Sequence, residues 1–209
     1  MIVAGGDAVA SELLEAVPDP DYVIAADSGL DLAMQLGIPV DVVVGDLDSA
    51  SEQAADTARA AAVEFSIHPE DKDQTDLELA LSLAGQHEPE RVIIVGGGGG
   101  RLDHLLANAA LIEHAPFRDI QWITADAYTY VVRERAQIGG VPGGLVTLLA
   151  IGSDATGVRT EGLAWELNGE TLEAGSSRGV SNRFTEPVAH IEVATGALLV
   201  VVNQAAHEA

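Results

Sequence analysis

The segment from Val40 to Ser49 reads Val-Asp-Val-Val-Val-Gly-Asp-Leu-Asp-Ser, and it decides the fold of this chain. Its first half is mostly apolar and β-branched, as in a buried strand, and its second half is a glycine-led turn with two carboxylates. A continuous apolar strand is typical of a parallel sheet that is covered on both faces. The segment therefore predicts polar chemistry at the carboxyl end of a buried strand.

The same pattern of strand and helix extends over the first 125 residues. Apolar runs follow the opening Met1–Gly6 segment at Tyr22–Ala26, Val40–Val44, Val63–Ile67, Arg91–Val95 and Ile120–Thr124. Helix-like stretches lie between them at about 8–16, 28–36, 50–62, 75–85 and 103–114. Capping boxes beginning at Ser49 and Thr75 support two of the helix starts. We therefore expect residues 1–125 to form an α/β domain with a Rossmann-like parallel sheet.

The pattern changes after about Asp126, where short alternating runs and turn signals such as Gly139-Gly140 and Asn168-Gly169 replace helices. The expected strands lie at Tyr128–Ile138, Leu145–Ile151, Gly157–Leu167, Glu170–Leu172, His190–Val193 and Ala197–Val202. Residues 126–209 are therefore predicted to form a smaller all-β domain, either a sandwich or a barrel.

Composition narrows the possible partners and compartment. The 209 residues carry a net charge of −23, which disfavours binding to nucleic acid and to anionic membranes. No apolar run is long enough for a membrane span, and the N-terminal residues do not resemble a signal peptide. The chain has no cysteine, which excludes disulfides and thiolate metal sites and fits a cytoplasmic enzyme.

The acidic surface also suggests a habitat. One lysine, nine arginines and 33 acids are typical of a salt-adapted protein, in which high ionic strength screens self-repulsion. This hypothesis predicts that thermal stability rises between roughly 0.1 M and 2 M KCl, because added salt shortens the range of charge repulsion. Equal stability at both concentrations would count against it.

Carboxylates follow several of the predicted strands. Asp27 ends one strand, Asp46 and Asp48 follow the next, and Asp76 begins a helix further along the chain. Because the carboxyl ends of parallel strands share one edge of the sheet, these acids become neighbours in space. Hard divalent cations such as Mg²⁺ prefer oxygen ligands and also take substrate phosphates. Each acid alone has another explanation, since a carboxylate also favours a helix N-terminus.

Two further segments add cations to the same edge. The only lysine, Lys72, lies in an acidic run with Asp71 and Asp73, which alone would be a solvated turn. Gly96–Gly100 precedes Arg101-Leu102-Asp103-His104 and opens a helix, so its backbone N–H groups and the arginine could meet phosphate oxygens. Asp103 could equally be an N-cap and His104 a half-buried helix residue, and His68 is predicted to be structural.

These motifs together resemble the thiamine pyrophosphokinase family over nearly the whole chain. The matching segments are Ala26-Asp27-Ser28-Gly29, Gly45-Asp46-Leu47-Asp48-Ser49, Asp71-Lys72-Asp73-Gln74-Thr75-Asp76, Gly99-Gly100-Arg101-Leu102-Asp103-His104 and Ser181-Asn182. The first four are specific together, whereas Ser-Asn alone is weak and lies in a segment that could be an ordinary loop. Leu47 replaces a usual aromatic residue, and Val180 stands where threonine is common.

The resemblance implies an enzyme that transfers a pyrophosphoryl group from ATP to the hydroxyl of thiamine with Mg²⁺. It implies a homodimer, with thiamine between the nucleotide domain of one subunit and the β domain of the other. It assigns roles to residues of this chain as follows: Asp46, Asp48 and Asp76 as metal ligands; Asp73, Asp103, Lys72 and Arg101 as catalytic; Asp27, Ser28, Gly99, Gly100, Arg101, Asp103 and His104 at ATP; and Ser181, Asn182 and Phe184 at thiamine.

Three alternatives stay open from the sequence. The hydroxyl proton could go to Asp73 or to Asp103. The acceptor could be a pterin alcohol instead of thiamine, because related archaeal proteins share this nucleotide domain. The chain could also be a sensor that binds a nucleotide or thiamine diphosphate without catalysis. Trp165 is expected to be a core residue and not a ligand platform.

Overall fold

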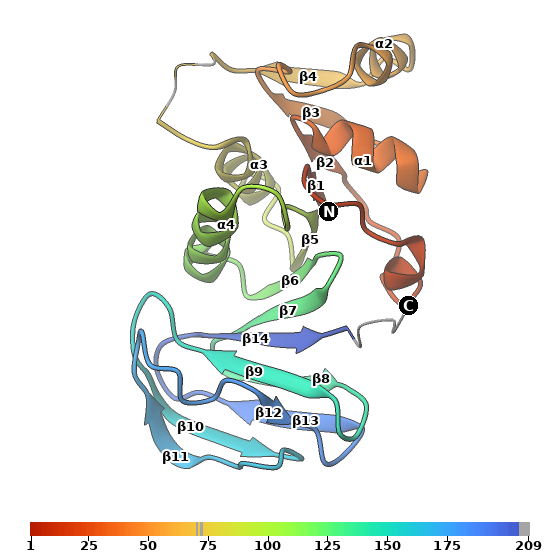
Figure 1. The fold of residues 1–209 in the computed structure, drawn as a ribbon. Helices are drawn as coiled ribbons and strands as arrows, with labels where there is room; N and C mark the ends of the chain where they lie inside the picture. Colours follow the sequence, from red (N-terminus) through yellow and green to blue (C-terminus); the bar gives the residue numbers. More distant parts are fainter. Residues whose placement is uncertain (70, 72, 205–209) are drawn as a thin grey trace. The chain divides into compact units, whose positions relative to one another are not determined.

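The computed structural model describes residues 1–69, 71 and 73–204 (Figure 1). It contains a ten-stranded sheet and a separate four-stranded antiparallel sheet, so the predicted mixed α/β class is confirmed. The Rossmann-like label for the first part and the sandwich or barrel for the second stay predictions. The chain divides into two compact units. Unit 1 is Met1–Asn108 with Trp122–Ala125, and unit 2 is Ala109–Gln121 with the chain from Asp126 onward.

Unit 1 is built on parallel strands in the order β5-β1-β2-β3-β4. Their bounds are β1 Ile2–Ala4, β2 Ile24–Ala26, β3 Val42–Gly45, β4 Glu64–Ile67 and β5 Arg91–Gly96. Strands β1 to β3 are buried along their whole length, as expected from their continuous apolar sequence. Strand β4 ends this order and is only partly buried.

The helices of this part follow the strands in sequence. They are α1 Gly29–Leu36, α2 Glu52–Ala60, α3 Asp76–Gly85 and α4 Leu102–His114, and the division into units falls within α4. Helices α1 and α3 both pack on β1 and β2, and Figure 1 shows them on opposite sides of these strands. The sheet is therefore covered on both faces, as the sequence predicts. In the described part of the chain, no helix has both the length and the apolar character that a membrane span requires.

Two local predictions were wrong. The segment at about 8–16 forms only a short 3₁₀ helix, Ser11–Leu14. None of these four residues is buried, so no apolar stripe holds a longer helix. Helix α2 is capped by Ser51, whose side chain accepts from the Ala54 N–H, and not by Ser49. The predicted cap of α3 is confirmed, since the Thr75 hydroxyl accepts from the Glu78 N–H at 3.3 Å.

Unit 2 carries antiparallel strands in two groups, β12-β9-β14-β7 and β11-β10-β13-β8. Their bounds are β7 Ala127–Val132, β8 Arg135–Gly139, β9 Leu145–Leu149, β10 Ala155–Glu161, β11 Asn168–Leu172, β12 Asn182–Arg183, β13 Val188–Glu192 and β14 Leu198–Asn203; β6 Asp119–Ile123 falls at the division. One core cluster lies between these strands, and it includes Val146, Leu148, Ile191 and Phe184.

The run predicted at Tyr128–Ile138 is two strands, because Arg133 and Glu134 separate β7 from β8. The guanidinium of Arg133 donates to the carbonyl oxygens of Phe117, Glu113 and Ala115, so it caps the end of α4 instead of continuing a strand. The two-residue strand β12 carries no periodic signal, so the sequence did not predict it.

Candidate active site

Two loops of unit 1 meet at the carboxyl ends of neighbouring strands. Strand β1 lies between β2 and β5, so the chain leaves β1 toward one side of the sheet and returns on the other. The loops after β1 and β5 are joined by hydrogen bonds from the Gly97 N–H to the Gly5 carbonyl at 2.7 Å and from the Asp7 N–H to the Gly98 carbonyl at 3.0 Å. Such a switch point is where open parallel sheets bind ligands.

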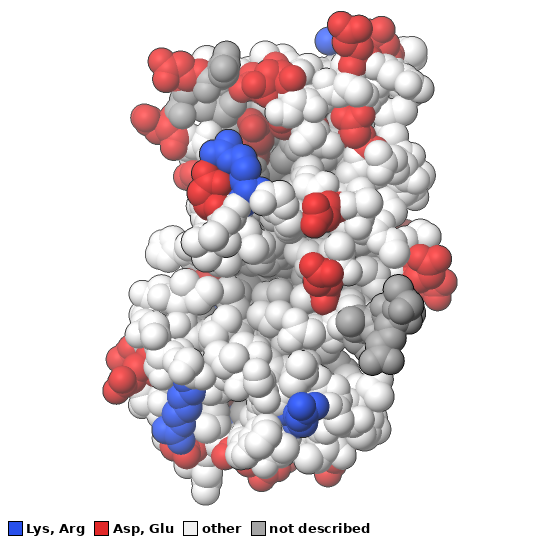
Figure 2. All heavy atoms as spheres, viewed as in Figure 1, with Lys and Arg blue, Asp and Glu red and all other residues white. Residues whose placement is uncertain are grey.

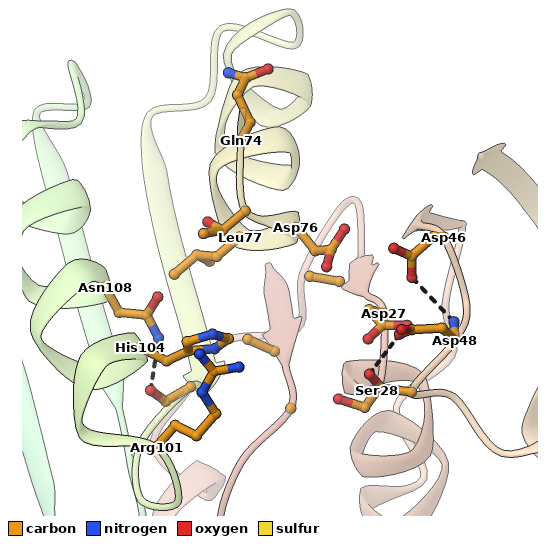
Figure 3. Close-up of a pocket in the computed structure, with 16 residues that line it drawn as sticks. Asp27, Ser28, Asp46, Asp48, Gln74, Asp76, Leu77, Arg101, His104 and Asn108 are labelled. Atoms are coloured by element: carbon orange, nitrogen blue, oxygen red, sulfur yellow. Dashed lines mark hydrogen bonds between the residues drawn. The ribbon is translucent and has the colours of Figure 1, made fainter. Parts of the chain in front are cut away.

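A cavity of about 520 Å³ opens at this edge, entirely within unit 1 (Figure 3). Its walls come from the ends of β1, β2 and β3 and from the first turns of α3 and α4. The lining residues are Ala4, Gly5, Ala26, Asp27, Ser28, Asp46, Asp48, Ser49, Gln74, Thr75, Asp76, Leu77, Gly97, Arg101, His104 and Asn108. The cavity therefore gathers acids from three separate segments of the sequence.

Three carboxylates in this cavity form a compact group. Asp27, Asp46 and Asp48 each offer one oxygen, and these oxygens lie within 4.8 Å of one another. The loop is held locally, because the Asp48 N–H donates to Asp46 Oδ1 at 3.1 Å and the Ser49 hydroxyl donates to Asp48 Oδ1 at 2.8 Å. Asp27 Oδ1 is buried without a hydrogen-bond partner among the described residues. An all-oxygen donor set with an unsatisfied buried oxygen fits a hard divalent cation.

Asp27 is the most buried acid of the group, with 7% of its surface exposed. Burial raises its pKa above the ordinary value, and the charges of Asp76 and Asp46 act in the same direction. Hydrogen bonds from Ser49 and from the Ser28 backbone oppose that rise in pKa. An ionised Asp27 in the metal-free protein therefore costs folding free energy, which a bound cation would offset.

We expect Asp27→Asn to raise the melting temperature of the metal-free protein at pH 7. The folded-state pKa of Asp27 lies above the unfolded value, so its charge destabilises the fold at neutral pH, and this penalty disappears as pH falls through the folded-state pKa. Thermal unfolding with a chelator, at neutral and acid pH, measures it. An unchanged melting temperature at neutral pH would contradict the argument.

The group differs from the predicted metal ligands in one member. Asp46 and Asp48 belong to the group as predicted ligands, and its third member is Asp27. Asp76, the other predicted ligand, lines the same cavity but is not part of the group. Asp76 is nonetheless close to the loop, because a Cβ added to Gly45 would lie 3.0 Å from Asp76 Oδ1 and 3.2 Å from Asp27 Cβ. Only a residue without a side chain leaves room at Gly45, whose φ is 140°.

Arg101 lines the cavity, and its guanidinium already has a partner. Its Nε and Nη2 donate to the two carboxylate oxygens of Asp103 at 3.1 and 2.6 Å. The hydrogen bond from Arg101 lowers the pKa of Asp103 to about 2. A carboxylate with so low a pKa accepts a proton poorly at neutral pH, and Asp103 does not line the cavity. This geometry argues against the predicted role of Asp103 as base.

The glycine segment meets the cavity through Gly97 and not through Gly99 or Gly100. A Cβ added to Gly99 would lie 1.9 Å from Asp7 Oδ2, so a carboxylate occupies the space beside it. The predicted phosphate contacts of Gly99 and Gly100 are therefore not supported by this arrangement. Asn108, which the sequence analysis missed, donates to the Gly97 carbonyl at 2.9 Å and is buried. Its spacing of four residues from His104 on α4 was the available signal.

The other predicted residues of unit 1 divide into two sets. Ser28 and His104 line the cavity, and His104 is exposed there. Asp73 is exposed and does not line the cavity. Lys72 lies outside the described residues. His68 pairs with the Ser66 hydroxyl at 3.2 Å, away from the lining residues, as expected of a structural histidine.

In unit 2, Asn182 and Phe184 are core residues, with 4% and 2% of their surfaces exposed. Phe184 packs under Gly140, where an added Cβ would lie 2.3 Å from the ring, so this buried ring presents no open surface for stacking. The Asn182 amide binds the backbone of Trp165 on both sides, accepting from its N–H at 3.1 Å and donating to its carbonyl at 2.8 Å.

The exposed aromatic surface beside this pair belongs to Trp165, which is 61% exposed. The expectation that Trp165 is a core residue is therefore wrong. Ser181 is exposed with a φ of 61°, and its N–H donates to the Thr147 hydroxyl at 3.0 Å. Asn182 thus holds the backbone that carries the exposed indole, and Ser181 precedes Asn182 in the chain.

The comparisons with known proteins agree over both units. Residues 14–124 match a family model described as "Thiamin pyrophosphokinase, catalytic domain", and residues 131–199 match one described as the vitamin B1 binding domain of thiamin pyrophosphokinase. Thiamine pyrophosphokinase of Bacillus subtilis is 36% identical over 112 residues, which cover 53% of this chain and 52% of that protein. Thiamine pyrophosphokinase 1 of rice is 24% identical over 72% of this chain and 61% of its own length.

The chain thus spans only about half to three fifths of the curated relatives that it matches. Solved structures extend the likeness to the whole fold. The Bacillus subtilis thiamine pyrophosphokinase structure is 25% identical with a TM-score of 0.83 and covers 98% of both chains. The Geobacillus thermodenitrificans structure is 21% identical with a TM-score of 0.82 and covers 99% of this chain and 97% of its own. The first family model alone accounts for more than half of the sequence, and the chain belongs to the thiamin pyrophosphokinase family.

Proposed function

We propose that this protein transfers a pyrophosphoryl group from ATP to the hydroxyl of thiamine, giving thiamine diphosphate and AMP. The observation that carries the proposal is the group of Asp27, Asp46 and Asp48 at the switch point, in a chain that matches both family models. Transfer of phosphoryl-type groups depends mostly on positioning and on charge stabilisation. A cavity rich in carboxylates suits that chemistry only if cations join the substrate there.

In this proposal Asp27, Asp46 and Asp48 hold Mg²⁺, and Asp76 faces the same cavity as a further acidic group. When bound, Mg²⁺ supplies positive charge that neutralises the phosphate oxygens. Ser28 lines the same cavity and offers a hydroxyl to the phosphates. Gly97 and Asn108 form part of the wall, because the Gly97 N–H donates to Gly5 and the Asn108 amide donates to the Gly97 carbonyl. Arg101 and His104 stand at its rim, where they can bind the same anion.

The reaction forms a bond between the hydroxyl oxygen of thiamine and the β-phosphorus of ATP. The bond from that phosphorus to the oxygen bridging toward the α-phosphorus breaks, and AMP leaves with the electron pair. The hydroxyl proton needs an acceptor. Asp73 stays the predicted acceptor, since the bond with Arg101 lowers the pKa of Asp103 to about 2.

Thiamine recognition is proposed for unit 2, with Trp165 as the aromatic surface and Ser181 as a polar contact. Thiamine carries an aromatic cation, and an exposed indole favours such a group through stacking and cation–π attraction. The buried Asn182 amide fixes the backbone of Trp165, so its proposed role is to orient the indole-bearing segment. This assignment replaces Phe184, which is buried.

Trp165→Ala should raise the KM for thiamine about tenfold or more while the KM for ATP stays unchanged, because base–aromatic stacking is worth about 1–3 kcal/mol. Initial rates with each substrate varied in turn measure the split. Trp165→Phe should retain most of the affinity, and the exposed Val141→Ala serves as a matched truncation on the same unit. Equal changes in both KM values would argue against thiamine stacking.

The function itself is tested by incubating the purified protein with ATP, Mg²⁺ and thiamine in high KCl and following AMP and thiamine diphosphate. We expect both products in equal amounts. AMP with a pterin alcohol but not with thiamine would favour the alternative acceptor. Tight binding of thiamine diphosphate without any AMP would instead identify a sensor.

The proposal extends to a cytoplasmic homodimer, in which the nucleotide domain of one subunit and the β domain of its partner share thiamine. The acidic composition supports salt adaptation, and the face shown in Figure 2 carries far more acidic than basic side chains. Light scattering over a range of KCl concentrations tests the dimer. A monomer at every concentration would exclude a shared site.

A further inference from the structure

The side chain of Asp31 joins helix α1 to the end of the loop that carries Asp46 and Asp48. The proposed reaction assigns no role to Asp31. Asp31, in the first turn of α1, accepts a hydrogen bond from the Ser51 N–H at 2.9 Å through Oδ2, and its Oδ1 accepts from the Ser51 hydroxyl. We propose that Asp31 is a positioning residue that sets the metal affinity of the carboxylate group through Ser51. This inference rests on the proposed function, since it assumes that Asp46 and Asp48 bind the cation.

The loop that carries Asp46 and Asp48 is attached at both ends. At its start, Gly45 is held in the sheet, where its carbonyl accepts from the His68 N–H at 3.0 Å. At its end, Ser51 is the N-cap of α2, and its hydroxyl oxygen accepts from the Ala54 N–H at 3.1 Å. The carboxylates of Asp46 and Asp48 lie between these two fixed points. A shift of Ser51 therefore moves the loop relative to Asp27, which belongs to the sheet edge.

The loop needs such an anchor because its own conformation is strained. Leu47, between the two acids, has a φ of 65°, a left-handed conformation that costs a non-glycine residue free energy. A strained loop stays in one geometry only when its surroundings hold it there. Asp31 is suited to the task, since the next turn of α1 buries Leu32 and Ala33 and the helix cannot move freely.

Ser51 satisfies three groups at once. Its N–H and hydroxyl both donate to the Asp31 carboxylate, and its hydroxyl oxygen accepts from Ala54 at the start of α2. A second cavity of about 440 Å³, lined in part by Asp31, Ser49 and Ser51, brings solvent to this contact. A single neutral hydrogen bond that is open to solvent competes poorly with water. Two bonds from Ser51 to one carboxylate are stronger, and together they fix the orientation of Ser51 relative to Asp31.

The test measures Mn²⁺ binding to the protein without nucleotide, by calorimetry or electron paramagnetic resonance. Groups that orient metal ligands typically change affinity by about 10–100-fold, and we expect the low end, about tenfold weaker binding, for Asp31→Ala and for Ser51→Ala. Ser51→Ala removes the hydroxyl bond and keeps both the Asp31 carboxylate and the bond from the backbone N–H, so it tests one of the two bonds without a change of charge. Ser51→Thr keeps the hydroxyl and should bind Mn²⁺ as the unchanged protein does.

Two controls make the outcomes distinct. Asp56→Gly weakens α2 at an exposed position away from the loop and should leave Mn²⁺ affinity unchanged, which excludes a general effect of helix stability. Asp48→Asn should reduce affinity more than either variant of the contact. Normal affinity in Asp31→Ala, with Asp48→Asn impaired, overturns the positioning role alone. Normal affinity in Asp48→Asn overturns the metal site and this inference with it. A loss in Asp31→Ala but not in Ser51→Ala shows that the hydroxyl bond does not position the loop and overturns the two-bond contact on which the inference rests.

Discussion

Replacing Asp48 by asparagine is expected to lower the rate of AMP formation at least 100-fold, and Asp46→Asn is expected to do the same. Each change removes one negative charge from a group whose three oxygens lie within 4.8 Å. A 100-fold loss corresponds to about 2.7 kcal/mol of transition-state stabilisation, a plausible cost for weakening a cation that neutralises phosphate charge. The measurement is turnover at saturating ATP and thiamine over a range of Mg²⁺ concentrations.

The matched control for both variants is Asp56→Asn, an equal change of charge at an exposed position of α2. It should leave turnover within about twofold, because surface substitutions away from a site have small effects. Circular dichroism should show that all three variants are folded. Near-normal rates in either Asp46→Asn or Asp48→Asn would remove the metal assignment.

Gly96→Ala is expected to destabilise the protein by about 3 kcal/mol or more, enough to prevent folding of a marginally stable chain. Gly96 ends β5 with a φ of 85°, a conformation that disfavours any side chain. A Cβ there would also lie 2.0 Å from the Ala4 carbonyl oxygen, so β5 and β1 would have to separate at the switch point. Urea unfolding of the purified variant, or its absence from the soluble fraction, measures the effect.

Comparison with Gly100→Ala separates the loss of stability caused by the steric clash from the loss caused by the positive φ. Gly100 also has a positive φ, 59°, but an added Cβ there meets no atom within 4 Å. We expect it to cost only about 1–2 kcal/mol, from the backbone conformation alone. If both variants lost the same stability, close packing at Gly96 would not be the cause.

The parallel strands could be predicted because each signal lies within one short segment. Val42–Gly45 and Val92–Gly96 are apolar without interruption, and a glycine ends each of them. The start of α2 could not be fixed in the same way, since Ser49 and Ser51 both suit an N-cap. The contact between Ser51 and Asp31, twenty residues earlier, accompanies the cap that forms, and no local pattern shows it.

The sequence predicted which acids line the candidate site, but only partly which of them form the compact group. Asp46 and Asp48 follow a strand, so their position was readable from sequence. Whether Asp27 or Asp76 joins them depends on how two sheet segments and α3 meet, which no local pattern contains. The pairing of Arg101 with Asp103 is likewise a choice of side-chain conformation that spacing alone leaves open.

The aromatic residues of unit 2 show a second limit. Trp165 lies in a predicted strand, whereas Phe184 ends a polar segment that reads as a loop, and the pairing of Leu163 with Phe184 is not visible in either. In the structure Phe184 pairs with Leu163 and is buried in the core, whereas Trp165 is exposed. Sequence alternation predicts that one face is buried, but a single pair of irregular strands is too short to say which.

The most direct test of the account is the anomalous diffraction of a crystal soaked in Mn²⁺. We expect a peak within about 2.5 Å of carboxylate oxygens from Asp27, Asp46 and Asp48, at the edge of the sheet where the loops after β2 and β3 meet. A peak held by other residues, or no peak at a concentration that supports turnover, would contradict it.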